Sequence, residues 1–215
     1  VTRYSLENVE FLLARDVKMV VVACNSASAV ALGAIAARYP LPTVGVIEPG
    51  ARAAVERTRS GRIGVIGTEA TIASGAYTRA LRALRPAVEV YTRPCPLLVP
   101  LAEEGWLEGP IPRGAVETYL ASLRTSGIDT LVLGCTHYPL LKPVIAEVMG
   151  ERVALVDSAE ETARDVAAVL EARDLARRHG TGSASFFVTD VPDRFIRIGQ
   201  RFLGARLESA VRIER

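Results

Sequence analysis

Residues 18–26 read Lys-Met-Val-Val-Val-Ala-Cys-Asn-Ser, and residues 129–137 read Asp-Thr-Leu-Val-Leu-Gly-Cys-Thr-His. In each stretch an apolar run and one small residue are followed by a cysteine and two polar residues. The apolar runs are continuous and rich in β-branched residues, which is typical of strands buried on both faces of a parallel sheet. We therefore predict two similar α/β lobes, with Cys24 and Cys135 each at the carboxyl end of a strand.

The rest of the chain alternates short apolar runs with longer helical patterns, which predicts mostly parallel sheets flanked by helices. We assign residues 1–50 and 158–215 to the first lobe, incomplete at its N-terminus, and residues 51–157 to the second, with the active site in the cleft between them. Predicted strands span residues 18–23, 43–46, 62–66, 88–91, 130–134, 153–156 and 185–188. Predicted helices span residues 27–38, 49–58, 72–84, 113–126, 140–148, 160–178 and 193–203. Residues 94–112, with five prolines, are expected to form one long irregular segment.

Composition excludes several classes of protein. The net charge of +2 over 215 residues gives no indication of a nucleic-acid partner. No apolar run approaches the roughly 20 residues that cross a bilayer, and the N-terminus lacks a secretory pattern. We therefore expect a cytoplasmic protein with no membrane partner.

The three cysteines are widely spaced and form no C-x-x-C pair. This argues against a disulfide framework or a zinc site, so no metal is expected. No G-x-G-x-x-G or Walker-type loop is present, so no nucleotide cofactor is expected either. Nucleophilic catalysis by one cysteine with a histidine would leave the second cysteine unexplained.

A matched pair of thiols suits removal of a proton from one face of a carbon and its return to the other. Each cysteine is expected just before a helix N-terminus, a position that can lower a thiol pKa from about 8.5. His137 could take or return a proton. Taken alone, a strand-end cysteine is more often a small buried hydrophobe, but the repeat of the whole motif favours a functional pair. Polar side chains next to the sulfurs are Asn25, Ser26 and Thr136.

Residues Ala23–Ala29 (Ala-Cys-Asn-Ser-Ala-Ser-Ala) and Gly134–Pro139 (Gly-Cys-Thr-His-Tyr-Pro) closely resemble the two signatures of the glutamate racemases, within the aspartate/glutamate racemase superfamily. The family usually has threonine where Ser26 stands, which keeps the hydroxyl. Other stretches that are similar to the family are residues 64–71, 95–105 and 156–161.

The resemblance implies a cofactor-independent, two-base interconversion of L- and D-glutamate that supplies D-glutamate for peptidoglycan precursors. It implies that Cys24 deprotonates the D-isomer, that Cys135 deprotonates the L-isomer, and that His137 assists Cys135. Glu103 matches an acidic residue near the family's site. An ordinary solvated carboxylate on a loop is an equally good interpretation of Glu103. Family members are often dimers, so a homodimer is one expected state. Positions that match substrate contacts in the family are Asn25, Ser26, Thr136 and His137, with Thr68 and Thr71 as further candidates.

Three other features complete the expectations. Asp157-Ser158 is interpreted as structural, with Ser158 and Glu161 forming a capping box, and Cys95 is interpreted as a packing residue.

The family begins with a strand ending in Asp-Ser-Gly and a Pro-Tyr-Gly segment, which the printed sequence lacks, so we expect further residues upstream of Val1. The alternatives left open are a non-catalytic interaction module on a racemase fold, and a racemase of aspartate or a related amino acid.

Overall fold

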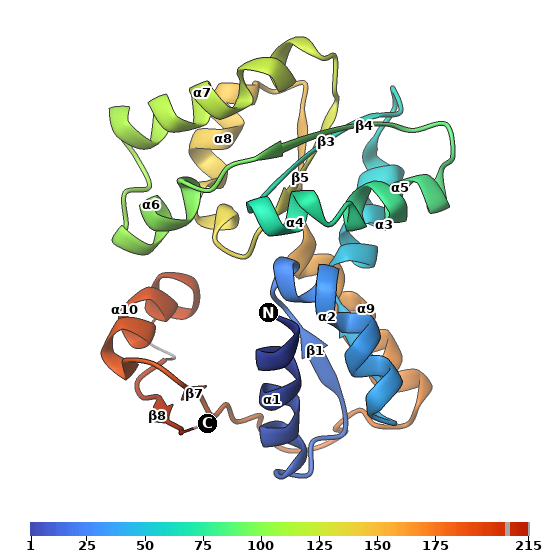
Figure 1. Cartoon of the computed structure of the whole chain (residues 1–215), viewed down its shortest axis with the longest axis vertical. Coiled ribbons are helices and arrows are strands. Elements are labelled where there is room, and N and C mark those ends of the chain that lie inside the picture. The colour runs from blue at the N-terminus through green and yellow to red at the C-terminus, as the bar shows by residue number, and fades with distance from the viewer. Residues whose placement is uncertain (205–206, 215) are drawn as a thin grey trace. The chain divides into compact units, whose positions relative to one another are not determined.

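The computed structural model describes residues 1–204 and 207–214, and the chain divides into two compact units, Val1–Leu175 and Ala176–Arg215 (Figure 1). The predicted division into two similar lobes remains a prediction. The first unit contains α1 (Thr2–Leu13), β1 (Val20–Val22), α2 (Asn25–Arg38), β2 (Thr43–Gly45), α3 (Ile47–Arg57), β3 (Arg62–Gly67), α4 (Glu69–Ala73), α5 (Ala76–Leu84), β4 (Glu89–Pro94), α6 (Leu98–Glu104), α7 (Pro110–Thr125), β5 (Thr130–Gly134), the 3-10 helix η1 (Tyr138–Leu141), α8 (Lys142–Met149), β6 (Ala154–Asp157) and α9 (Ser158–Ala172). The second contains β7 (Phe187–Val188), α10 (Pro192–Leu203) and β8 (Val211–Arg212).

The larger sheet of the first unit has the strand order β4-β3-β5-β6, and all its pairs are parallel. Every residue of β5 is buried. Leu131 and Leu133 pack in a core with α6, α7 and α8, whereas Val132 and Val65 pack in another with α3 and α5. Figure 1 shows these two groups of helices on opposite sides of the sheet. The α/β class and the doubly buried central strands are therefore confirmed.

The smaller sheet pairs β1 with β2 in parallel. Val20 and Val22 are buried against α1 and α2, but Val21 between them is 42% exposed. The prediction that this strand is buried on both faces is therefore wrong at Val21, whose side chain points away from the face that α1 and α2 cover and remains exposed.

Two further predicted segments differ from the structure. Residues 94–112 are not irregular throughout, because α6 forms there on its buried side chains Leu98 and Leu101. Pro100 is tolerated because it lies in the first turn of α6, where backbone N–H groups have no helical partner. The predicted helix at residues 72–84 is two helices, separated where Gly75 takes a positive φ of 66°.

The helix that follows β6 begins and ends differently from the prediction. Its N-cap is Asp157, whose Oδ1 accepts a hydrogen bond from the backbone N–H of Ala159 at 2.9 Å. Ser158 is the first helical residue, so the predicted capping box is wrong. The helix ends at Ala172, well before residue 178, and Asp174 follows with a positive φ of 53°. An aspartate tolerates that conformation better than most residues, so it suits the end of a helix.

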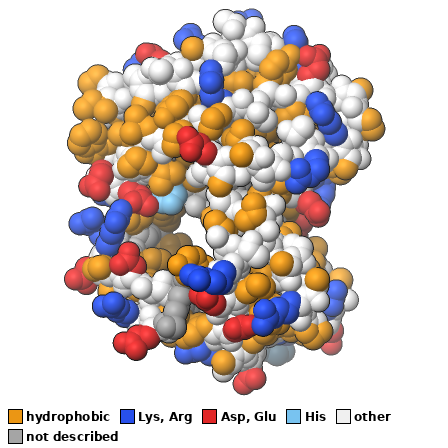
Figure 2. Space-filling model, viewed as in Figure 1, with side chains coloured by type: hydrophobic (Ala, Val, Ile, Leu, Met, Phe, Trp, Pro, Cys, Tyr) orange, Lys and Arg blue, Asp and Glu red, His pale blue; other side chains and the backbone are white. Residues whose placement is uncertain are grey.

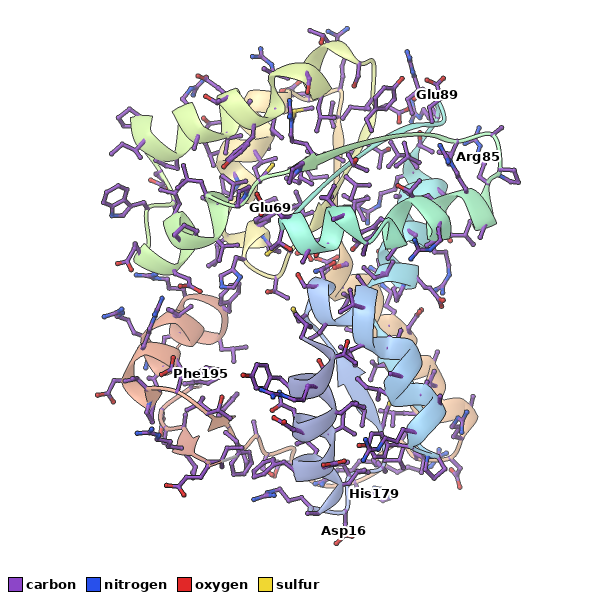
Figure 3. All side chains as sticks on the ribbon, in the orientation of Figure 1. Asp16, Glu69, Arg85, Glu89, His179 and Phe195 are labelled. Atoms are coloured by element: carbon purple, nitrogen blue, oxygen red, sulfur yellow. The ribbon has the colours of Figure 1, made fainter. Side chains whose placement is uncertain are left out.

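The second unit is a small βαβ arrangement in which β7 and β8 pair in parallel and α10 connects them. The ring of Phe195, labelled in Figure 3, lies 6.3 Å from that of Phe186. Nothing within residues 1–204 or 207–214 forms a helix with the length and apolarity needed to span a bilayer. Figure 2 shows acidic and basic side chains interspersed over the visible surface, as expected from the small net charge.

Candidate active site

Cys24 is the N-cap residue of α2, at the carboxyl end of β1, and its side chain is exposed. The first turn of α2 is fixed by Ser28, whose Oγ donates a hydrogen bond to the carbonyl of Val22 at 2.6 Å and accepts one from the N–H of Val46 at 3.2 Å. One buried hydroxyl therefore ties α2 to the carboxyl ends of both strands of the small sheet. The predicted position of this cysteine, before a helix N-terminus, is confirmed.

Cys135 follows β5 directly and is only 7% exposed. The segment after it is a turn that leads into η1 and then α8, so the helix predicted at residues 140–148 forms but is preceded by a 3-10 turn. The phenol of Tyr138 donates a hydrogen bond to the carbonyl of Cys95 at 2.8 Å, which anchors the turn to the loop after β4. Cys95 is fully buried, in keeping with its interpretation as a packing residue.

Burial raises the pKa of the Cys135 thiol to about 11, because the interior disfavours the thiolate. The backbone N–H groups of His137 and Tyr138 lower it in part, while negative charge on Cys24 raises it further. The expectation of a lowered pKa at this cysteine is therefore wrong for the protein without substrate: desolvation outweighs the N–H groups.

His137 links Cys135 to a carboxylate. Its Nδ1 lies 3.8 Å from the Cys135 Sγ and 3.4 Å from the Thr136 Oγ1. Its Nε2 lies 3.3 Å from Oε1 of Glu103, which comes from α6. A carboxylate beside Nε2 favours a proton on that nitrogen and leaves Nδ1 to face the thiol. Glu103 was expected to be either a residue near the site or a solvated loop carboxylate, and its contact with His137 favours the first interpretation.

Asn25, next to Cys24, is buried, and its Oδ1 accepts a hydrogen bond from the phenol of Tyr77 at 2.7 Å. Burial raises the pKa of Tyr77, which keeps its phenol protonated as a donor. The amide orientation of Asn25 is thereby set, with its oxygen engaged and its NH₂ as the group available for other contacts. Sequence reasoning missed Tyr77, since a tyrosine on the apolar face of α5 has the pattern of an ordinary core residue.

Three hydroxyl groups form a triangle between α2 and the start of α4. Ser26 shares hydrogen bonds with Thr68 (2.8 Å) and Thr71 (3.0 Å), and the two threonines are 3.1 Å apart. Thr68 is also the N-cap of α4, accepting from the N–H of Thr71. All three predicted polar residues therefore meet, and they hold the first turn of α2 against the carboxyl end of β3.

Glycines permit the strand ends to approach the site closely. Gly67 and Gly134 are register partners at the ends of β3 and β5. A Cβ on Gly134 would lie 2.6 Å from the carbonyl oxygen of Ile66 and 3.0 Å from the ring of Tyr77. Only glycine fits there without a shift of backbone, and this requirement was also missed from the sequence.

The arrangement can perform acid/base chemistry at carbon. It offers an exposed thiol, a buried thiol with a histidine and a carboxylate beside it, and amide and hydroxyl groups on the residues that follow the two cysteines. In the described part of the chain, no group of three or more histidine, cysteine, aspartate or glutamate side chains could hold a metal ion. The fold and the site define the class of α/β isomerases that move a proton with paired thiols.

The chain belongs to the Asp/Glu/Hydantoin racemase family, whose model matches residues 2–166. A glutamate racemase from Geobacter metallireducens is 60% identical over 208 residues, which cover 96% of this chain and 77% of that protein. The glutamate racemase structure from Bacillus anthracis superposes with a TM-score of 0.93 at 37% identity, covering 100% of this chain and 79% of that one. The structure from Francisella tularensis, solved in complex with D-glutamate, gives a TM-score of 0.89 at 31% identity, covering 99% and 78%.

Proposed function

We propose that the chain catalyses the cofactor-independent interconversion of L- and D-glutamate and thereby supplies D-glutamate for peptidoglycan precursors. The observation that carries this is the pair Cys24 and Cys135, at the carboxyl ends of β1 and β5, within a fold that is similar to glutamate racemases over almost its whole length. The aspartate alternative has weaker support, because the sequence identities of 37% and 60% are to glutamate racemases.

The reaction needs one base and one acid on opposite faces of the substrate. In the direction from L to D, the thiolate of Cys135 takes the Cα proton and the thiol of Cys24 gives a proton to the other face of the carbanion. In the reverse direction the thiolate of Cys24 takes the proton and the thiol of Cys135 returns one. Two thiols with different environments suit this exchange, since one must be protonated while the other is not.

Glu103 and His137 serve Cys135 in this scheme. With its Nε2 proton directed at Glu103, His137 presents Nδ1 to the thiol and accepts its proton before the L-isomer reacts. Burial holds the pKa of Cys135 at about 11, so few thiolates would exist at neutral pH without such a base. The carboxylate of Glu103 stabilises the imidazolium that results.

The remaining predicted residues bind the substrate. The NH₂ of Asn25 and the hydroxyls of Ser26 and Thr136 are donors suited to the carboxylates of glutamate. Thr68 and Thr71 complete the hydroxyl cluster around Ser26. A dicarboxylate needs donors at both ends, and these residues supply them from the two cysteine-bearing segments.

A deuterium-exchange experiment tests the proposal. In D₂O the unaltered chain should racemise L-glutamate with deuterium at Cα. Cys24→Ala should exchange deuterium into L-glutamate but form no D-glutamate, whereas Cys135→Ala should do the converse with the D-isomer. Each result follows because the remaining thiol can remove and return a proton only on its own face. Absence of racemisation by the unaltered chain would favour the non-catalytic alternative, and faster reaction with aspartate would favour the other.

Two further expectations follow from the same proposal. We place the reaction in the cytoplasm, since the mechanism needs Cys24 and Cys135 as free thiols, which a reducing compartment maintains. We also expect a homodimer, to be tested by sedimentation equilibrium. A single species of monomer mass across the working concentration range would contradict it.

A further inference from the structure

A cavity of about 770 Å³ opens at the amino ends of β3, β5 and β6. It lies at the sheet edge opposite the candidate active site. The five residues of β5, at about 3.3 Å each, put roughly 16 Å between the cavity and Cys135. Figure 3 marks both edges: Glu89 is at the start of β4, and Glu69 is just beyond the end of β3. No step of the racemisation uses this edge.

Four arginines line the cavity: Arg57, Arg59, Arg124 and Arg152. Arg57 is already engaged, since it donates to the carbonyl of Leu155 at 3.2 Å and pairs with Glu161 at 3.4 Å. The guanidinium groups of Arg59, Arg124 and Arg152 make no hydrogen bond or ion pair with any residue that the structure describes. Three unpaired cations around one cavity repel each other, and an anion between them would relieve that repulsion.

The acidic residues of the cavity form no ion pair with these arginines in the part of the chain that the structure describes. Asp129 accepts hydrogen bonds from the Thr58 hydroxyl at 2.6 Å and from the N–H groups of Arg59 and Ser60 at 2.9 and 2.6 Å. Burial opposes the charge, but these donors outweigh it and hold the pKa of Asp129 well below its ordinary value. Its oxygens are thus occupied by donors from the chain itself. Glu151 is the other carboxylate in the lining.

Part of the cavity is apolar. Ile128 and Met149 are buried core residues that also reach its surface, and Val153 lies beside them. A purely inorganic ion would leave this part unfilled, whereas a molecule with an apolar ring and a charged group would use both. The volume also exceeds what one phosphate would occupy.

We propose that this cavity binds an organic phosphate, with the phosphate groups on Arg59, Arg124 and Arg152 and the organic part against Ile128 and Met149. Guanidinium groups suit this role because their planar donors match phosphate oxygens in pairs. The structure supplies several of them in one place without intramolecular partners.

Isothermal titration of the full chain with adenosine diphosphate tests the proposal. One saturable site is expected, with weaker binding of inorganic pyrophosphate and weaker binding still of adenosine. Each of Arg59→Gln, Arg124→Gln and Arg152→Gln should weaken binding by about five- to tenfold, the effect of losing one charge-assisted pair. Raising the salt concentration should weaken binding as well.

Two controls keep the test independent of folding defects. Arg82 is an exposed arginine of α5 outside the cavity, so Arg82→Gln should leave the affinity unchanged. Glu151→Gln removes a negative charge from the cavity and should tighten binding, a gain that a misfolded protein would not show. Racemase activity plays no part in these measurements, so the proposal stands or falls separately from the proposed function.

Three outcomes would overturn the proposal. The first is that adenosine diphosphate shows no saturable binding at millimolar concentration. The second is that Arg82→Gln changes the affinity as much as the cavity variants do. The third is that pyrophosphate binds as tightly as the nucleotide. The last would show that the apolar part of the cavity takes no part in recognition.

Discussion

The phenol of Tyr77 donates a 2.7 Å hydrogen bond to the side-chain oxygen of Asn25, the residue that follows Cys24. The same tyrosine ring lies so close to Gly134, the residue before Cys135, that a Cβ there would be 3.0 Å from it. One buried side chain thus contacts the neighbours of both cysteines. Tyr77 is therefore placed to fix the relative positions of the two segments.

Replacing Tyr77 with phenylalanine should raise the KM for glutamate several-fold and lower kcat less. The ring still fills its space, but the Asn25 amide loses the partner that orients it toward substrate. The unfolding free energy should fall by about 1 kcal/mol, the usual contribution of one hydrogen bond. Steady-state kinetics and urea unfolding measure the two effects. Tyr91→Phe is the matched control, because the phenol of Tyr91 donates a hydrogen bond to Glu89 at the far edge of the sheet. Equal changes in KM in the two variants would contradict the role of Tyr77.

Replacing Glu103 with glutamine should lower kcat by about 10- to 100-fold, less than the roughly 10²- to 10⁴-fold contributed by a group that transfers the proton itself, because Glu103 acts through His137. The neutral amide cannot stabilise an imidazolium at His137, so Cys135 loses the base that takes its proton. The acidic limb of the pH–rate profile should change, and Glu103→Asp should recover part of the rate. Glu104→Gln, on the adjacent residue of α6, is the control. A pH profile unchanged by Glu103→Gln would argue that this carboxylate is only structural.

Replacing Gly134 with alanine should destabilise the protein by about 1–3 kcal/mol, the cost of overpacking a close-packed site. The new methyl would lie 2.6 Å from the carbonyl oxygen of Ile66, so the ends of β3 and β5 must separate. Thermal unfolding measures the loss. Gly33→Ala is the counterpart, because its Cβ meets nothing within 4 Å and alanine favours the helix α2. A Gly134→Ala protein of unchanged stability would contradict this steric requirement for glycine at the end of β5.

The buried thiol of Cys95 should make the protein less stable at alkaline pH. Burial raises its pKa from 9.0 to about 12, so the unfolded chain releases this proton at lower pH than the folded chain does. Its stabilising contribution is complete below pH 9 and is lost as the pH rises toward 12, at up to about 1.4 kcal/mol per pH unit. Unfolding free energies between pH 8 and pH 10.5, on the unaltered chain and Cys95→Ala, should converge as the pH rises. Parallel curves would contradict the shifted pKa.

The sequence allowed the α/β class and the cysteine pair to be predicted because both are local features. A continuous apolar run followed by a small residue and a cysteine describes a strand and its end within one short segment. The same pattern occurs around Cys24 and Cys135, and both strands form. Ser26 was predicted from its place beside Cys24, but Thr68 and Thr71 only through a family resemblance, since Ser26 and Thr68 meet across 42 residues.

Contacts between distant segments could not be predicted from local patterns. α6 lies in a proline-rich stretch, so its helical form and the approach of Glu103 to His137 depend on packing of Leu98 and Leu101. Tyr77 has the spacing of a core residue and reveals its polar contact only in three dimensions. The pKa of Cys135 was expected to fall because the sequence shows the residues that follow the thiol but not how deeply the thiol is buried.

The unequal burial of the two sulfurs has a consequence for chemical modification. Cys24 is exposed at the start of α2, whereas Cys135 is 7% exposed and its pKa is raised to about 11. An alkylating reagent reacts with an accessible thiolate, so it should label Cys24 well before Cys135. An electrophilic inhibitor built on the substrate's scaffold would therefore best carry its reactive group toward the α2 side.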